Sequence, residues 1–113
     1  MMKELLISLC AATPLLAQSE PGLRLFSPIL QNEVQIVDGQ GTVVHSWPGQ
    51  FNLSVAMTED GSLLRSVVES IAVFPGSTGR LQKLDIGGNL TWDLVINNSQ
   101  RLMHHDIELL PNG

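Results

Sequence analysis

The sequence predicts an all-β fold and, within that class, a β-propeller of which only about two blades are present. Three observations lead to this prediction. Short runs of β-branched and apolar residues alternate with glycine-containing turns, one hairpin pattern occurs twice, and a further repeat begins near the end of the chain. An apolar leader precedes these repeats.

The first 17 residues have the layout of a secretory signal peptide. Lys3 places a positive charge near the start, residues 5–12 are apolar, and Ala12 or Ala17 offers a small residue for cleavage. The apolar stretch is too short to span a bilayer. A buried N-terminal helix is the alternative, and the lack of an amphipathic period disfavours it. We therefore expect a mature part of residues 18–113 in the periplasm or outside the cell.

Composition argues against several classes of function. Cys10, the only cysteine, lies in the leader, so the mature part has no disulfide framework, thiolate nucleophile or cysteine-ligated metal site. The net charge of −5 is spread thinly, without the clusters of Lys and Arg that bind nucleic acids. No later segment is apolar for long enough to form a transmembrane helix. We expect no nucleic-acid partner, and no membrane contact after the leader is removed.

Two hairpins share one sequence pattern. The first joins strands expected at residues 34–38 and 42–47 through a glycine turn. The second joins strands expected at residues 81–85 and 90–94 in the same way. The two hairpins align without gaps at an offset of 47 residues. The sequence therefore indicates a duplication.

Two further strands are expected between the hairpins, at residues 53–57 and 62–67, joined by a turn at residues 59–61. That turn has a counterpart at residues 111–113, at an offset of 52 residues. Residues 66–74 could form a short helix, but their Val and Ile residues favour a strand. No segment has a convincing helical period.

A four-stranded unit that recurs about every 40–50 residues is typical of propeller blades. One blade is a small twisted sheet with two apolar faces, which only neighbouring blades can cover. A closed propeller needs at least about four blades. We therefore expect residues 18–113 to be the truncated N-terminal part of a β-propeller domain. Chance similarity between two hairpins is the alternative.

The densest polar cluster is His104, His105 and Asp106, followed by Glu108. It precedes a strand expected at residues 107–110. The first strand of a blade is innermost, so its start faces the mouth of the central channel. Imidazoles in that place can bind an anion or transfer a proton. Spacing alone leaves three roles open: catalysis or ligand binding, a structural hydrogen-bonding corner, and a metal site. A metal is the least favoured, because neighbouring strand residues point to opposite faces.

Other polar residues give weaker signals. We expect His45 to be structural, and Trp47 and Trp92 to pack between blades. Arg80 and Arg101 could each bind an anion, although a lone arginine in a loop is usually solvated. No Ser/His/Asp triad can be assigned from order or spacing.

Taken in order, these segments resemble the N-terminal portion of the bacterial arylsulfotransferases, the aryl-sulfate sulfotransferases that use no nucleotide sulfate donor. Single segments are weak matches, and the ordered series is fairly specific. It ends in His104-His105-Asp106-Ile107-Glu108 and covers nearly all of the mature chain. The matching segments are residues 25–28, 37–49, 59–65, 79–92 and 104–113.

The resemblance implies a six-bladed propeller that moves a sulfuryl group from a phenolic sulfate ester to a phenol through a sulfated histidine, without a cofactor or metal. An aryl sulfate and a phenol would be its small-molecule partners. The sulfated histidine of this family lies in a later blade, which this chain does not include. His105 and, after it, His104 are the catalytic residues that the resemblance assigns here, to contact sulfate or handle protons.

Two other hypotheses stay open. One is a non-catalytic propeller that binds a ligand or a protein partner on one face, because a fold does not by itself imply a function. The other is an open reading frame whose product has no stable fold of its own.

Overall fold

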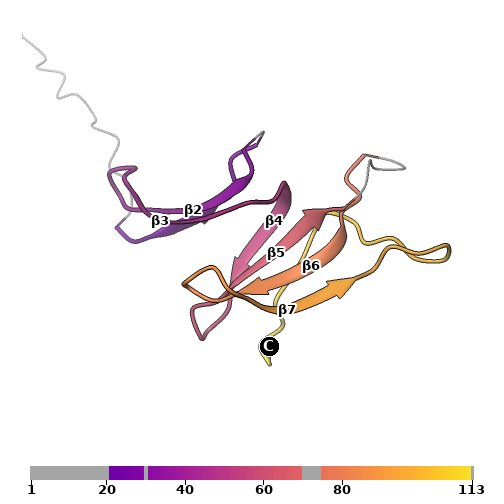
Figure 1. The fold of residues 1–113 in the computed structure, drawn as a ribbon. Coiled ribbons are helices and arrows are strands. Elements are labelled where there is room, and N and C mark those ends of the chain that lie inside the picture. The colour runs from indigo at the N-terminus through magenta and orange to yellow at the C-terminus, as the bar shows by residue number, and fades with distance from the viewer. Residues whose placement is uncertain (1–20, 30, 70–74, 113) are drawn as a thin grey trace, which may run out of the picture.

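The computed structural model describes residues 21–29, 31–69 and 75–112, and in these residues the fold is all-β (Figure 1). Seven strands form two antiparallel sheets, and no helix occurs in the described ranges. The all-β prediction is therefore confirmed. The described ranges also hold no helix with the length and apolarity needed to cross a bilayer. The predicted signal peptide and its cleavage site lie outside the described residues.

The first sheet has three strands in the order β1-β2-β3, and the second has four in the order β4-β5-β6-β7. The first sheet consists of β1 (Arg24–Phe26), β2 (Glu33–Val37) and β3 (Val43–Pro48). The second consists of β4 (Asn52–Met57), β5 (Leu63–Val68), β6 (Gly79–Leu84) and β7 (Leu90–Val95). All six strands expected in the two hairpins and between them are present. The sequence pattern did not predict the short strand β1.

One predicted strand is wrong. Residues 107–110, expected to form a strand, form no ladder with any described residue. Leu109 and Leu110 of this segment instead lie across a groove from Leu64 and Leu81 of the second sheet. The strand expected beyond residue 66 ends at Val68, and residues 70–74 lie outside the described ranges.

The duplicated hairpins have the same turn geometry. Asp38 and Asp85 each accept a hydrogen bond at Oδ1 from the backbone N–H four residues further on, at 2.9 and 2.8 Å. Their carbonyl oxygens accept from the N–H of Gly41 and Gly88 at 3.1 and 3.0 Å. Both glycines have positive φ, 83° and 86°, which a residue with a side chain rarely adopts. The strand registers also shift at equivalent places, between Ile36/Val37 and between Lys83/Leu84.

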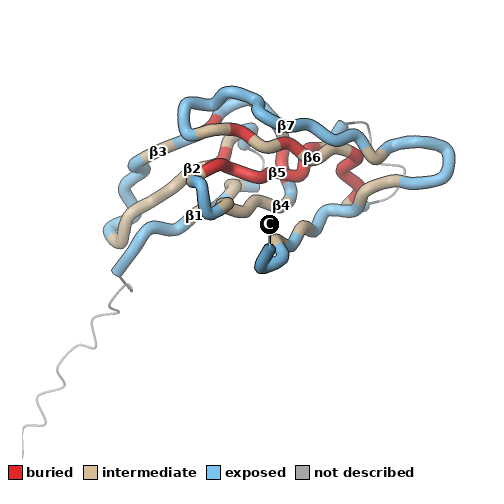
Figure 2. The backbone as a smooth tube through the Cα atoms, turned by 90° about the horizontal axis from the view of Figure 1, so that it is seen from below, coloured by how far each residue is buried: buried red, intermediate tan, exposed pale blue. Residues whose placement is uncertain are grey.

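The two sheets pack face to face around a small apolar core (Figure 2). Val34 and Trp47 of the first sheet meet Leu63 and Leu84 of the second, and all four side chains are at most 5% exposed. Trp47 also donates its indole N–H to the carbonyl oxygen of Asp85 at 2.8 Å, a polar link between the sheets. Trp47 thus packs between two sheets as expected.

Trp92 differs from Trp47. It was expected to pack in the same way, but it is 45% exposed. It lies on the face of the second sheet that points away from the first sheet. The sequence-based expectation was that a neighbouring sheet covers each tryptophan. In the described residues another sheet covers only one face of the second sheet, and Trp92 lies on the other face.

Candidate functional site

The segment that carries the two histidines is fixed to the second sheet through its backbone. Thr78 donates from its N–H to the carbonyl oxygen of Met103 at 2.9 Å and from its hydroxyl to that of His104 at 2.8 Å. The hydroxyl of Ser66, in β5, donates to the carbonyl oxygen of His105 at 3.0 Å. Thr78 and Ser66 are 2% and 0% exposed. Buried hydroxyls therefore hold the backbone of the pair and leave both imidazoles outside.

The two imidazoles lie side by side over Gly76. Their ring centroids are 4.2 Å apart, with the planes tilted by 46°. A Cβ atom at Gly76 would lie 2.9 Å from Nε2 of His104 and 3.0 Å from Cδ2 of His105. Gly76 also has a φ of +87°. Glycine is favoured on both counts, since any other residue would strain the backbone and displace the rings.

This arrangement changes the expectation drawn from strand geometry. Adjacent residues of a strand point to opposite faces. His104 and Ser77 form an isolated β-bridge rather than part of a ladder, and His105 lies in a bend. Their backbone groups bond to Ser66 and Thr78 rather than to a ladder, so both rings can contact the same glycine. The structure thus brings together the two site residues that the sequence singled out.

The acidic neighbours of the pair do not form a metal centre with it. Asp106 is exposed, and its carboxylate accepts from the N–H of Ile107 at 3.0 Å. Glu108 is also exposed. Within the described ranges, no group of three or more His, Cys, Asp or Glu side chains lies close enough to hold a metal ion. The pair offers instead two accessible nitrogen-bearing rings that could receive an anion or exchange a proton.

Arg80, one of the two arginines considered as anion ligands, is already paired. Its Nη1 lies 2.7 Å from Glu69, and its Nε lies 3.2 Å from Asp93. The second contact is close enough for an ion pair but is not aligned as a hydrogen bond. Two carboxylates thus neutralise this guanidinium. Arg101 is exposed in a turn, where its N–H bonds to the Asn98 side chain at 2.9 Å.

Arg65 is a buried polar residue that the sequence pattern did not single out. It is 5% exposed on β5, and its Nε and Nη2 donate to Oε1 of Gln82 at 3.1 and 2.9 Å. Its buried Nη1 has no hydrogen-bond partner among the described residues. Burial lowers the pKa of this guanidinium from its ordinary value by desolvation. The alternation of side chains along β5 could have indicated that Arg65 is buried, because Arg65 lies between Leu63 and Val67, which face inward.

A groove of about 760 Å³ lies on the other side of the second sheet from the first sheet, and the histidine pair does not line it. Leu64, Leu81 and Trp92 provide apolar walls on the sheet, and Leu109 and Leu110 close the groove from the C-terminal segment. The remaining lining residues are Met57, Thr58, Glu59, Asp60, Lys83, Pro111 and Asn112. The groove and the histidine pair are therefore separate features of one face.

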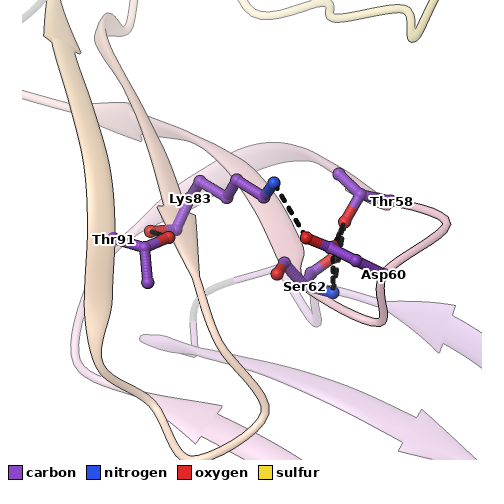
Figure 3. A network of polar contacts seen from close by, with 5 residues as sticks. All are labelled: Thr58, Asp60, Ser62, Lys83 and Thr91. Atoms are coloured by element: carbon purple, nitrogen blue, oxygen red, sulfur yellow. Dashed lines mark hydrogen bonds and ion pairs between the residues drawn. The ribbon is translucent and has the colours of Figure 1, made fainter. Parts of the chain in front are cut away.

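The turn between β4 and β5 contributes Thr58, Glu59 and Asp60 to the lining of this groove. Figure 3 shows the polar contacts of this turn. Asp60 accepts hydrogen bonds from the Thr58 hydroxyl and from the N–H of Ser62, and its other oxygen bonds to Nζ of Lys83 at 3.2 Å. These contacts, with that of Thr58 the largest, hold the pKa of the Asp60 carboxyl well below its usual range. Lys83 is therefore a paired cation at the rim.

No protein-family model, curated protein or solved structure matches the chain. The resemblance to the arylsulfotransferases therefore rests on the residue pattern alone.

Proposed function

We propose that this chain is the N-terminal part of an exported, arylsulfotransferase-like β-propeller, in which His105 and His104 contact the sulfate group and handle protons. One observation carries the proposal. Two exposed imidazoles lie together over Gly76 while buried hydroxyls hold their backbone. That is a rigid support for ring nitrogens that have to meet a substrate.

Sulfuryl transfer through a histidine takes two displacements. In the first, a histidine nitrogen supplied by a later blade attacks sulfur, the bond from sulfur to the phenolic oxygen breaks, and the leaving phenolate takes up a proton. In the second, the oxygen of an acceptor phenol attacks sulfur, the nitrogen–sulfur bond breaks, and the acceptor loses its proton. Both steps need a group that gives and receives protons, and charge on the sulfate oxygens has to be stabilised.

His104 and His105 supply groups of this kind. A protonated imidazole donates N–H bonds to sulfate oxygens and can protonate the leaving phenolate, and a neutral one can accept the proton of the incoming phenol. The ring centroids lie 4.2 Å apart, so both imidazoles can reach groups of one small substrate.

The first test is binding of an aryl sulfate to the full chain. With the Cε1 positions of the three histidines labelled with ¹³C, 4-nitrophenyl sulfate should shift the NMR signals of His104 and His105. The partly buried His45 is an internal reference, because it lies on β3 in an edge-to-face contact with Trp47. The His105→Ala and His104→Ala variants assign the signals. If 4-nitrophenol produces the same shifts, or if His45 moves equally, the proposed sulfate contact is wrong.

The second test is transfer itself, in a propeller that carries this segment together with its later blades. His105→Ala should lower the rate from an aryl sulfate to a phenol at least about tenfold. An unchanged rate removes His105 from the site. Binding of the aryl sulfate without transfer by the unaltered propeller would favour the non-catalytic binding module.

A further inference from the structure

The backbone that carries the two histidines is held at three consecutive carbonyl groups. Thr78 donates its N–H to the carbonyl oxygen of Met103 at 2.9 Å and its hydroxyl to that of His104 at 2.8 Å. Ser66 donates its hydroxyl to the carbonyl oxygen of His105 at 3.0 Å. Each carbonyl belongs to one peptide plane, because a peptide group is planar and rigid. Three successive planes are therefore fixed, with the Cα atoms of the two histidines between them.

The two histidines have different supports. Thr78 holds the planes on both sides of the His104 Cα atom. Of the planes on the two sides of the His105 Cα atom, Thr78 holds the first and Ser66 holds the second. Two fixed planes determine φ and ψ of the residue between them, and thereby the direction in which its side chain leaves the backbone. Within the pair, Ser66 therefore acts on His105.

An irregularity in β4 fixes the Ser66 hydroxyl in turn. The register of β4 on β5 shifts between Asn52 and Ser54, so Leu53 has no register partner on β5. The N–H of Ser54 bonds to the Ser66 hydroxyl oxygen at 2.9 Å. The hydroxyl has one hydrogen to donate, and the carbonyl oxygens of His105 and Ser54 lie 3.0 and 3.4 Å away. The shorter distance assigns this hydrogen to His105.

The preceding repeat has a serine at the same place and uses it differently. The residues before Ser27 and Ser66 pair with glutamines that are 47 positions apart, Phe26 with Gln35 and Arg65 with Gln82. Ser27 and Ser66 are therefore counterparts. The Ser27 hydroxyl donates to the carbonyl oxygen of Glu33, in its own sheet, at 3.1 Å. Ser66 instead donates to His105, 39 positions further along the chain. The use of this serine is thus particular to the repeat that meets the histidines.

We propose that Ser66 is the positioning residue of His105, and that the irregular register of β4 contributes to the site because it fixes the Ser66 hydroxyl. Ser66 is 0% exposed, so it acts through the backbone and not by contact with a substrate. It keeps the His105 ring beside that of His104, with the centroids 4.2 Å apart. The consequence for sulfuryl transfer rests on the proposed function, whereas the position of the ring does not.

The first test is the position of the rings in the full chain without a ligand. The Cε1 positions of the histidines are labelled with ¹³C. Ser66→Ala removes the donor without adding volume, and it should move the His105 NMR signal further than the His104 signal. Thr78→Val should move both signals, because it frees the peptide plane between the two residues.

Ser27→Ala is the matched control, since it removes the counterpart hydroxyl and its bond to a backbone carbonyl in the first sheet. It should leave the signals of His104 and His105 in place. Ser66→Cys keeps a side chain of similar size with a weaker donor. In reducing buffer it should give the same pattern as Ser66→Ala, and it decides the question if Ser66→Ala does not fold. Far-ultraviolet circular dichroism checks that each variant is folded.

The second test is transfer from an aryl sulfate to a phenol, in a propeller that carries this segment together with its later blades. Ser66→Ala should lower kcat about threefold or more, and by less than His105→Ala, because it displaces the imidazole without removing it. Ser27→Ala should leave kcat unchanged. The rate is taken per folded molecule, so a loss of stability alone does not change it.

Three outcomes in the full chain would overturn the proposal. These are a folded Ser66→Ala chain whose His105 signal stays in place, a His104 signal that moves as far as that of His105, and a Ser27→Ala chain whose signals move as far. In the propeller, an unchanged kcat in Ser66→Ala beside a lowered one in His105→Ala would exclude a part in catalysis. An unchanged rate in His105→Ala would instead refute the proposed function, and the NMR result would still decide the positioning.

Discussion

Gly76→Ala tests whether the histidine pair depends on the glycine beneath it. Gly76 has a φ of +87°, and a Cβ atom there would meet His104 at 2.9 Å and His105 at 3.0 Å. The added methyl group must therefore strain the backbone and push both rings. The neighbours are ends of flexible side chains, so we expect the rings to move and the sheet to stay folded.

The magnitude follows from two separate terms. Holding alanine in the left-handed region costs about 1–2 kcal/mol. Gly88→Ala isolates this term, because Gly88 has a φ of +86° and its Cβ would meet nothing within 4 Å. Both variants should therefore lose about 1–2 kcal/mol of unfolding free energy. Only Gly76→Ala should also displace the imidazoles, by the few tenths of an ångström that relieve the overlap.

Two assays separate the terms. Urea unfolding, followed by tryptophan emission at one protein concentration, gives the loss of stability. The Cε1–H NMR signals of His104 and His105 report the position of the rings. We expect both signals to move in Gly76→Ala and to stay in place in Gly88→Ala. If Gly76→Ala leaves both signals unchanged, the rings do not rest on Gly76 and the site geometry is wrong.

Three further predictions concern the supports of the fold. Thr78→Val keeps the side-chain shape but removes the hydroxyl donor to a backbone carbonyl, so urea unfolding should show a loss of about 1–3 kcal/mol; a loss below 0.3 kcal/mol would contradict the bond. Gln82→Leu leaves the buried Arg65 without an acceptor and should cost about 1.5–3 kcal/mol, whereas adding Arg65→Leu should restore most of that loss in a double-mutant cycle. Hydrogen bonds hold the pKa values of the Asp60 and Asp85 carboxyls below the ordinary value, for Asp85 chiefly those from Asn89. The two charged carboxylates therefore stabilise the fold above about pH 4, and this contribution is lost as the pH falls further. In thermal melts from pH 6 to pH 2, the chain with both Asp60→Asn and Asp85→Asn should lose less stability than the unaltered chain.

The sequence by itself determined the strands β2 to β7 and their tight turns, because the alternation and the turn chemistry depend on neighbouring residues. Alternating side chains define a strand, and a glycine with positive φ between an aspartate and the next strand defines the turn at Gly41 and again at Gly88. The offset of 47 residues therefore predicted two hairpins with equivalent registers. The sequence also singled out His104 and His105, by composition and by the family resemblance rather than by geometry.

The tertiary structure decided which faces are covered and how the histidines are held. Nothing in the local pattern distinguishes Trp47, which is 1% exposed, from Trp92, which is 45% exposed, because coverage depends on what stacks on each sheet. The strand expected at residues 107–110 is absent in the described residues because a strand needs a partner edge, and local propensity cannot supply one.

The contact of Gly76 with the two imidazoles joins segments far apart in the chain, as do the bonds from Ser66 and Thr78. The buried pair of Arg65 and Gln82 likewise depends on the register of β5 and β6. Local interactions therefore fixed the repeating units of this protein. The packing between units decided which of its polar groups are buried and which face the solvent.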